Sequence, residues 1–198
     1  SLAKLLVKKD WFADIKRIKY EYYWLKHCRK IIPNNIPKII KYDEKNKYLI
    51  IEFFNQDKYV TLKSLFLSKK IDIKLIKKIS ESLFRIHTKS TGLSIKKKFK
   101  GNSKNFYDLR LDAYFNEVKR VHPKLGNIID RIIVNYKLNS STLVHGDFSP
   151  KNILTDKKNL KFIDAETSNY GDPVFDLVFF ANHLLIKSIY IKSKKNYF

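Results

Sequence analysis

The segment 145–152 reads HGDFSPKN, and a second aspartate, Asp164, follows in the run FID at 162–164. Asn152 comes five positions after Asp147. Phosphoryl-transfer sites use one Asp to accept or orient the attacking hydroxyl, an Asn five positions later and a further Asp to hold magnesium. The order and spacing of these three side chains therefore predict chemistry of this kind.

The residues between Asn152 and Asp164 predict a β-hairpin. The runs 153–155 and 160–163 are rich in strand formers, and the polar stretch 156–159 separates them as a turn. Since a hairpin brings its two ends together, we expect Asn152 and Asp164 to be neighbours. Two oxygen donors so placed suit Mg²⁺, which prefers hard oxygen ligands and keeps several waters.

Two further elements follow in order, DAE at 164–166 and GDPVFD at 171–176. Together with H-G-D-x-x-x-x-N, this pattern resembles the signature of the aminoglycoside phosphotransferase and choline kinase superfamily. The combination is specific because several spaced positions match at once, whereas H-G-D alone is weak. The segments 7–14 and 109–114 also resemble a methylthioribose-kinase-like branch, and these two are much less diagnostic.

The resemblance implies an α+β, protein-kinase-like fold. A partial N-lobe with β-strands is expected over residues 1–54, and a mainly helical C-lobe with the catalytic hairpin over 55–198. It implies ATP and Mg²⁺ as cofactors and the hydroxyl of a small metabolite or aminoglycoside-like compound as acceptor. ATP and GTP are not distinguished, and neither the acceptor nor the oligomeric state follows from the residues.

Roles for individual residues follow from the same resemblance. Asp147 is expected to be the catalytic base, with Asn152 and Asp164 as magnesium ligands and Glu166 as a further metal or water contact. His145 is expected to orient the loop rather than to transfer protons, because a loose transition state demands little of a base. An isolated Asp or Asn beside a turn is more often a turn former or cap, so the argument depends on the ordered set.

Two acidic residues after the hairpin are interpreted as structural support. Asp172 is expected to tie down its Gly-Pro turn. Asp176 opens an apolar helix and is expected to act as its N-cap or as a brace for the catalytic loop.

The N-terminal part contains further candidates. A helix is predicted over 14–29 and a hairpin from the runs 39–42 and 48–52. Glu21 in that helix is predicted to be the acidic partner of the kinase strand lysine. The stretch Glu52-Phe53-Phe54 is predicted to be the hinge that meets adenine, a hypothesis that rests on fold analogy, with an ordinary strand end as the alternative.

The pattern departs from the family at both ends. A kinase N-lobe supplies a glycine-rich phosphate loop and a strand lysine, yet the first of the five glycines is Gly92 and the chain opens with Ser1. Lys4, Lys8 and Lys9 are candidate substitutes for the lysine. We therefore expect a fragment, cut at both ends, that alone binds nucleotide weakly and turns over little or not at all.

Helices are also expected over 73–88, 106–121 and 128–136, with a basic loop over 92–105 between the first two. The apolar stretch 174–191 is interrupted by Asp176, His183 and Lys187, so a membrane span is not expected. With a single cysteine and no visible signal peptide, the predicted location is cytoplasmic.

The formal net charge of +22 raises the alternative of a nucleic-acid-binding protein. The excess is nearly all lysine and is scattered over every segment, whereas arginine is the preferred residue for base readout. Specific nucleic-acid binding is therefore not expected. A non-catalytic nucleotide-binding module that keeps the signature but lacks the phosphate grip is the closer alternative.

Overall fold

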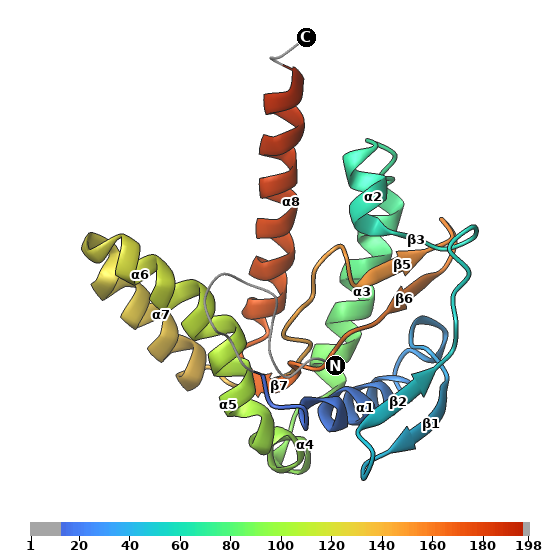
Figure 1. The fold of residues 1–198 in the computed structure, drawn as a ribbon, viewed down its shortest axis with the longest axis horizontal. Helices are drawn as coiled ribbons and strands as arrows, with labels where there is room; N and C mark the ends of the chain where they lie inside the picture. The colour runs from blue at the N-terminus through green and yellow to red at the C-terminus, as the bar shows by residue number, and fades with distance from the viewer. Residues whose placement is uncertain (1–12, 196–198) are drawn as a thin grey trace.

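The computed structural model describes residues 13–195 of the chain, and it is built from helices and small antiparallel sheets (Figure 1). It therefore has the predicted α+β class. The first lobe contains α1 (Arg17–Cys28), the 3-10 turn Pro33–Asn35, and the hairpin of β1 (Ile39–Asp43) and β2 (Tyr48–Ile51). Both the helix and this hairpin confirm the sequence prediction.

The strands after the hairpin are short and come together around residues 142–152, which contain the predicted catalytic residues and are called the catalytic segment below. β3 (Val60–Thr61) pairs with β5 (Ile153–Thr155), which pairs with β6 (Leu160–Phe162). β4 (Thr142–Val144) pairs separately with β7 (Asn169–Gly171). The antiparallel register Ile153↔Phe162 confirms the hairpin predicted between Asn152 and Asp164.

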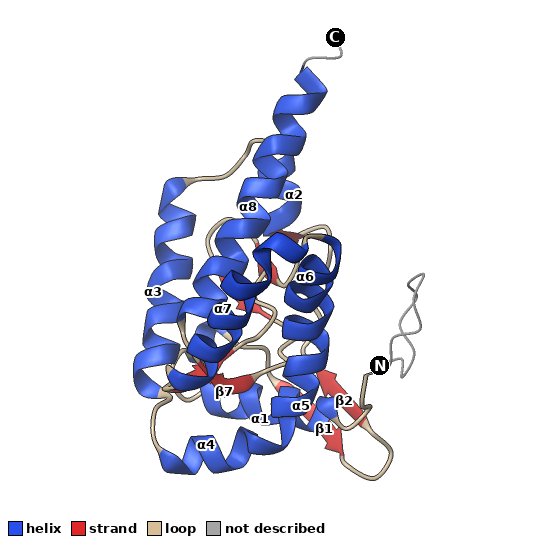
Figure 2. Ribbon diagram, turned by 90° about the vertical axis from the view of Figure 1, so that its left-hand side faces the viewer, coloured by secondary structure: helices blue, strands red, loops and turns tan. Residues whose placement is uncertain are grey.

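Helices cover these strands and form most of the second lobe (Figure 2). α3 (Ile73–Lys89) is capped by Asp72, whose side chain accepts a hydrogen bond from the Lys74 N–H. Its Leu75, Ile79, Leu83 and Ile86 are buried, as the periodicity predicts. The helices of this part are α2 (Leu62–Leu67), α3 (Ile73–Lys89), α4 (Leu93–Phe99), α5 (Ser103–Phe106), α6 (Glu117–Val121), α7 (Gly126–Leu138) and α8 (Val174–Lys195), with 3-10 turns at Lys100–Asn102 and Pro123–Leu125.

One prediction for the middle of the chain is wrong, and another is confirmed in a different helical form. The expected basic loop 92–105 contains α4 and α5, because lysine is a good helix former and Phe99, which is fully buried, anchors the segment in the core. The helix predicted over 106–121 is present, but its first part, Tyr107–Asn116 (η3), is π-helical and only Glu117–Val121 is α-helical. π-helical turns are rare and frequently occur at functional sites, and this one carries Arg110 to the catalytic segment.

The core lies where the two lobes meet. Trp24 and Leu25 of α1 are fully buried together with Leu143, Phe148 and other side chains of the catalytic segment. A second, smaller cluster joins η3, α7 and β4 around Phe106 and Tyr136, whose rings stack 5.0 Å apart. The segment 142–150 is buried throughout, so it has a fixed position between helices.

α8 projects from the body of the molecule in both views (Figures 1 and 2). Val174–Lys192 is long and apolar enough to cross a membrane by length and composition, with a mean hydropathy of 1.5, and only 6% of this window is buried. Asp176 in its first turn is nevertheless fully buried, whereas Val174 and Leu177 on the other face of that turn are about half exposed.

Candidate active site

The catalytic segment is held in place by Asp176 from the first turn of α8. Its carboxylate accepts the backbone N–H of His145 at 2.8 Å and that of Gly146 at 3.0 Å. Nε2 of His87 lies 3.0 Å from the same carboxylate. Asp176 therefore fixes the backbone just before Asp147 to two helices. Asp172 is placed at the start of α8, where its side chain accepts the Val174 N–H at 2.9 Å.

Gly146 occupies a position that no other residue can fill without strain. Its φ is +77°, and a Cβ there would lie 2.4 Å from the carbonyl oxygen of Thr167. The glycine carbonyl accepts a hydrogen bond from Nε of Arg110 at 2.6 Å. The tight turn thus brings η3 and the stretch after β6 against the catalytic segment.

His145 links the catalytic segment to the end of β6. Its Nε2 lies 3.1 Å from the carbonyl of Ile163 and its Nδ1 3.3 Å from the N–H of Asp147. These partners require a proton on Nε2 and a free pair on Nδ1, which is the neutral form. Burial lowers the pKa of His145, against the attraction of Asp176 and Asp147, and so favours that form. The ring is placed to orient the loop.

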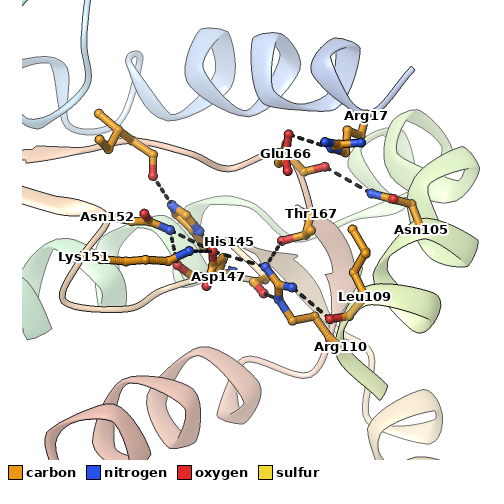
Figure 3. Close-up of polar contacts among 12 residues, drawn as sticks. Arg17, Asn105, Leu109, Arg110, His145, Asp147, Lys151, Asn152, Glu166 and Thr167 are labelled. Carbon is orange, nitrogen blue, oxygen red and sulfur yellow. Dashed lines mark hydrogen bonds and ion pairs between the residues drawn. The ribbon is translucent and has the colours of Figure 1, made fainter. Parts of the chain in front are cut away.

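Asp147 sits at the centre of a set of donors (Figure 3). Its Oδ2 is 3.0 Å from Nδ2 of Asn152, 3.0 Å from Nζ of Lys151 and 3.2 Å from a guanidinium nitrogen of Arg110. No hydrogen bond from the described residues ends on Oδ1. The carboxylate is therefore oriented through one oxygen, and the other is available to accept a hydrogen bond from a substrate hydroxyl.

Asn152 and Asp164 lie at the two ends of the β5–β6 hairpin, on the side of Asp147. The N–H of Ile163 donates to the carbonyl of Asn152 at 3.1 Å, which brings the chain at Asp164 next to Asn152. The amide nitrogen of Asn152 is engaged by Asp147, so its Oδ1 remains as an acceptor. Asp164 has a φ of +65°, a left-handed conformation that Asp tolerates better than most residues.

The carboxylates of Glu21, Asp164 and Glu166 lie close enough to influence one another. The pKa of Glu21 in α1 is raised to about 7, first because burial disfavours its charge and then because Asp164 and Glu166 repel it. Arg17 lies 2.7 Å from Glu166 and compensates that carboxylate. The lysine candidates Lys4, Lys8 and Lys9 and most of the segment 7–14 lie outside the described residues.

This arrangement fits a Mg²⁺ ion shared with a nucleotide. The described residues contain no group of three or more His, Cys, Asp or Glu side chains arranged to hold a metal by themselves. Mg²⁺ at kinase sites is typically bound through one or two protein ligands together with substrate phosphates and water. The Oδ1 of Asn152 and the carboxylate of Asp164 supply such a set, and the repulsion that raises the Glu21 pKa would be relieved by a cation.

The predicted hinge forms the end of the β1–β2 sheet. The N–H of Glu52 donates to the carbonyl of Lys38 at 2.8 Å, and the Glu52 carboxylate accepts the Lys38 N–H at 3.1 Å. Phe53 is 84% exposed, while Phe54 packs on Tyr59 with ring centroids 5.1 Å apart. A contact between this predicted hinge and adenine stays a prediction.

Sequence reasoning missed Arg110 and Lys151 as parts of the site. Arg110 lies 37 positions before Asp147, so the contact exists only after folding. Composition offered a signal, because the chain contains 35 lysines and 6 arginines. Arginine that persists against such a bias is typically needed for its planar set of donors, and Arg17 and Arg110 both bind acidic groups of this site.

The phosphotransferase enzyme family has a model that matches residues 13–188. This chain belongs to that family. The matched range begins just before α1 and ends within α8, so it includes the catalytic segment, the β5–β6 hairpin and Lys187. A methylthioribose-kinase-like branch stays a prediction.

The individual proteins that this chain resembles share about a quarter or less of its aligned residues. A LicA homologue protein of Mycoplasma capricolum subsp. capricolum is 25% identical over 144 residues, which cover 73% of this chain and 53% of the relative. The crystal structure of ADP-bound aminoglycoside phosphotransferase APH(2'')-Ib and the structure of the streptomycin–ATP–APH(2'')-IIa ternary complex show 21% and 22% sequence identity to this chain, with TM-scores of 0.48 and 0.45. Each alignment covers 81% of this chain and 57% of the solved one. The chain thus spans little more than half the length of these proteins.

Proposed function

We propose that this chain carries the catalytic centre of an ATP-dependent phosphotransferase that phosphorylates the hydroxyl of a small molecule. The observation that supports this most directly is the orientation of Asp147. Three donors hold one oxygen of its carboxylate, and the other faces no described donor. Family membership supports the same reaction class.

In the proposed reaction, the acceptor hydroxyl donates a hydrogen bond to Oδ1 of Asp147. As the hydroxyl oxygen bonds to phosphorus, its proton passes to this carboxylate and the bond from phosphorus to ADP breaks. Because the transition state is loose, positioning of the hydroxyl contributes more than the strength of the base. His145, Asn152 and Asp176 serve that positioning, since they fix the backbone and side chain of Asp147.

Mg²⁺–ATP supplies the phosphoryl group and neutralises its charge when bound. Asn152 and Asp164 are the residues proposed to hold the metal, with Glu166 less directly placed because Arg17 engages it. Glu52, Phe53 and Phe54 are proposed to meet the adenine. These assignments extend the family resemblance to particular positions.

The test measures the 198-residue chain beside the full product of its gene, called the complete protein below. ADP release is measured with Mg²⁺–ATP and a panel of hydroxyl compounds, and nucleotide binding is measured by titration calorimetry. We expect acceptor-dependent ADP release by the complete protein and weak nucleotide binding with little turnover by residues 1–198 alone.

The outcomes separate the proposal from its nearest alternative. Nucleotide binding by the complete protein without phosphorylation of any acceptor would favour a non-catalytic nucleotide-binding module. Turnover by residues 1–198 at rates typical of kinases, on the order of 1–100 s⁻¹, would contradict the expectation that these residues are insufficient. Turnover that survives the loss of Asp147 would remove the proposed base.

A further inference from the structure

The charges around Asp147 are divided between two sides of the site. On the side of α1 lie the carboxylates of Glu21, Asp164 and Glu166, with Arg17 paired to the last of these. On the other side Arg110 and Lys151 approach the Asp147 carboxylate itself (Figure 3). The acidic side suits Mg²⁺ and the nucleotide. A hydroxyl attacking in line must then come from the basic side.

The basic side continues along α8. The guanidinium of Arg110 lies 5.7 Å from the ring centroid of Phe179, and that ring lies 4.8 Å from the ring of His183. One helical turn further, Nζ of Lys187 donates to the carbonyl of His183 at 3.1 Å. These contacts form a continuous path from Asp147 to Lys187. We call Lys63, Arg110, Lys151 and Lys187 the cation group.

His183 lies between the two ends of the cation group, in contact with Lys187 on one side and with Phe179 on the other. Burial lowers the pKa of His183, and the charges of Lys187, Lys151 and Arg110 lower it further while Asp147 opposes them. Burial and the charge of Lys63 likewise lower the pKa of Lys187. Positive charges therefore outnumber the carboxylates in this partly buried space, where Asp147 is the acidic group that opposes them.

Apart from Asp147, the acidic residues in the segments that build this side are already engaged by other groups. Among the described residues there is no Asp or Glu in α2, in the stretch 148–152, or in α8 beyond Asp176 as far as Lys192. The two acidic residues of η3 are engaged elsewhere, Asp108 by Lys104 and Asp112 by Asn116. The buried Asp176 is occupied by backbone N–H groups and His87. Asp147 is left as the balancing charge.

The members of the cation group differ in how many donors they have to spare. Arg110 uses its donors on the carbonyls of Gly146 and Leu109, on Thr167 and on Asp147, so its role is to position. Among the described residues, Lys151 has one polar partner, Asp147, and its side chain is 54% exposed. Within the same part of the chain, the ammonium of Lys187 bonds to His183 alone. The two ammonium groups of Lys151 and Lys187 thus keep donors for a ligand.

We propose that the acceptor is an anionic hydroxyl compound, a small hydroxy acid or hydroxyalkyl phosphate, whose negative group is received by Lys151 and Lys187 while its hydroxyl reaches Asp147. Charge-assisted hydrogen bonds to a carboxylate or phosphate would stabilise it there. A polycation or a quaternary ammonium alcohol would instead meet like charges, which disfavour binding. This inference rests on the proposed function, because it assigns the acceptor of the same site.

The experiment uses the complete protein and acceptors that differ in charge. Glycerate and glycerol 3-phosphate are compared with neutral glycerol and with the cationic compounds choline and streptomycin. Binding is measured by calorimetry and phosphorylation by ADP release. We expect at least one anionic compound to bind about tenfold or more tightly than glycerol, and the two anionic compounds distinguish a carboxylate from a phosphate.

Two variants locate the effect. Lys187→Gln is expected to raise the Kd and KM of the anionic acceptor about tenfold without changing those of ATP or glycerol. Lys192→Gln, at an exposed lysine five positions further along α8, is the matched control and is expected to change nothing. Lys151→Gln is expected to affect both KM for the anionic acceptor and kcat, because Lys151 also contacts Asp147.

The inference is overturned if choline or streptomycin binds more tightly than every anionic compound, if no anionic compound binds at millimolar concentration, or if Lys187→Gln and Lys192→Gln behave alike. Its failure is separable from that of the proposed function. Turnover of a cationic acceptor would overturn the charge preference and leave the reaction standing. Binding of an anion that depends on Lys187, in a protein that does not consume ATP, would support the charge preference and overturn the proposed reaction.

Discussion

The two sides of Asp147 are built differently although they meet at one residue. The acidic side brings together Glu21 from α1 with Asp164 and Glu166 from the stretch after β6, and burial together with these like charges raises the pKa of Glu21 to about 7. The basic side joins η3, the catalytic segment and α8, and burial together with the charge of Lys63 lowers the pKa of Lys187. Each side holds an excess of one charge. The difference indicates that each awaits a ligand of the opposite sign, a cation on one side and an anion on the other.

The largest effect is expected where the two sides meet. Asp147→Asn keeps the shape of the side chain and removes its ability to accept a proton, so kcat should fall by about 10²–10⁴-fold. Nucleotide binding should change little, because Asp147 is not proposed to hold the metal. ADP release and nucleotide titration on the complete protein measure the two quantities. A loss of kcat below about threefold would exclude the general-base role.

The next effect isolates the acidic side. Asp164→Asn removes a proposed Mg²⁺ ligand and should raise the Mg²⁺ concentration for half-maximal activity on the order of 100-fold. Glu166→Gln is the informative comparison, since Arg17 already engages that carboxylate, and a much smaller change is expected. Equal effects of the two substitutions on the Mg²⁺ requirement would contradict the proposed ligand set.

Stability should depend on pH through Glu21 in the metal-free protein. Its folded-state pKa lies near 7, above the ordinary 4.5, so the folded state holds this proton more tightly than the unfolded chain. The contribution of this group to the free energy of unfolding is therefore largest below about pH 4.5 and falls as the pH rises to about 7. Because the Glu21 side chain is partly exposed to solvent, we expect the free energy of unfolding to fall by about 2 kcal/mol over this pH range.

Denaturant unfolding at several pH values measures this slope. Glu21→Gln should remove its share of the pH dependence, whereas Glu81→Gln, on an exposed face of α3, is the control and should leave it unchanged. The expectation fails if Glu21→Gln unfolds with the same pH dependence as the parent between pH 4.5 and 7.

The smallest effect is expected from a change on the basic side that keeps its charge. Arg110→Lys preserves the positive group but loses the fork that joins Gly146, Thr167 and Asp147. We expect kcat to fall about tenfold, since a slightly misplaced base costs rate rather than binding, with the KM of ATP unchanged. Steady-state kinetics at saturating ATP test this. An unchanged kcat would show that charge alone, without the planar geometry, is enough at this position.

Local sequence patterns were sufficient for several parts of the molecule. The hairpins β1–β2 and β5–β6 follow from runs of strand formers around polar turns, and α1 and α3 follow from their periodicity. The loop predicted over 92–105 failed for an identifiable reason. A run of lysines is compatible with both a solvated loop and a helix, and the burial of Phe99 decides for the helix.

The sequence by itself determined the order of the signature from His145 to Asp176, because the spacing of chemistry-bearing residues along a loop and a hairpin is a local property. Only the tertiary structure decided the charge around that signature. Arg110, Glu21 and Lys187 are distant from Asp147 along the chain and meet near it because helices bring them there. The physical reason is that side-chain contacts across elements depend on packing angles and burial, which one-dimensional spacing does not encode.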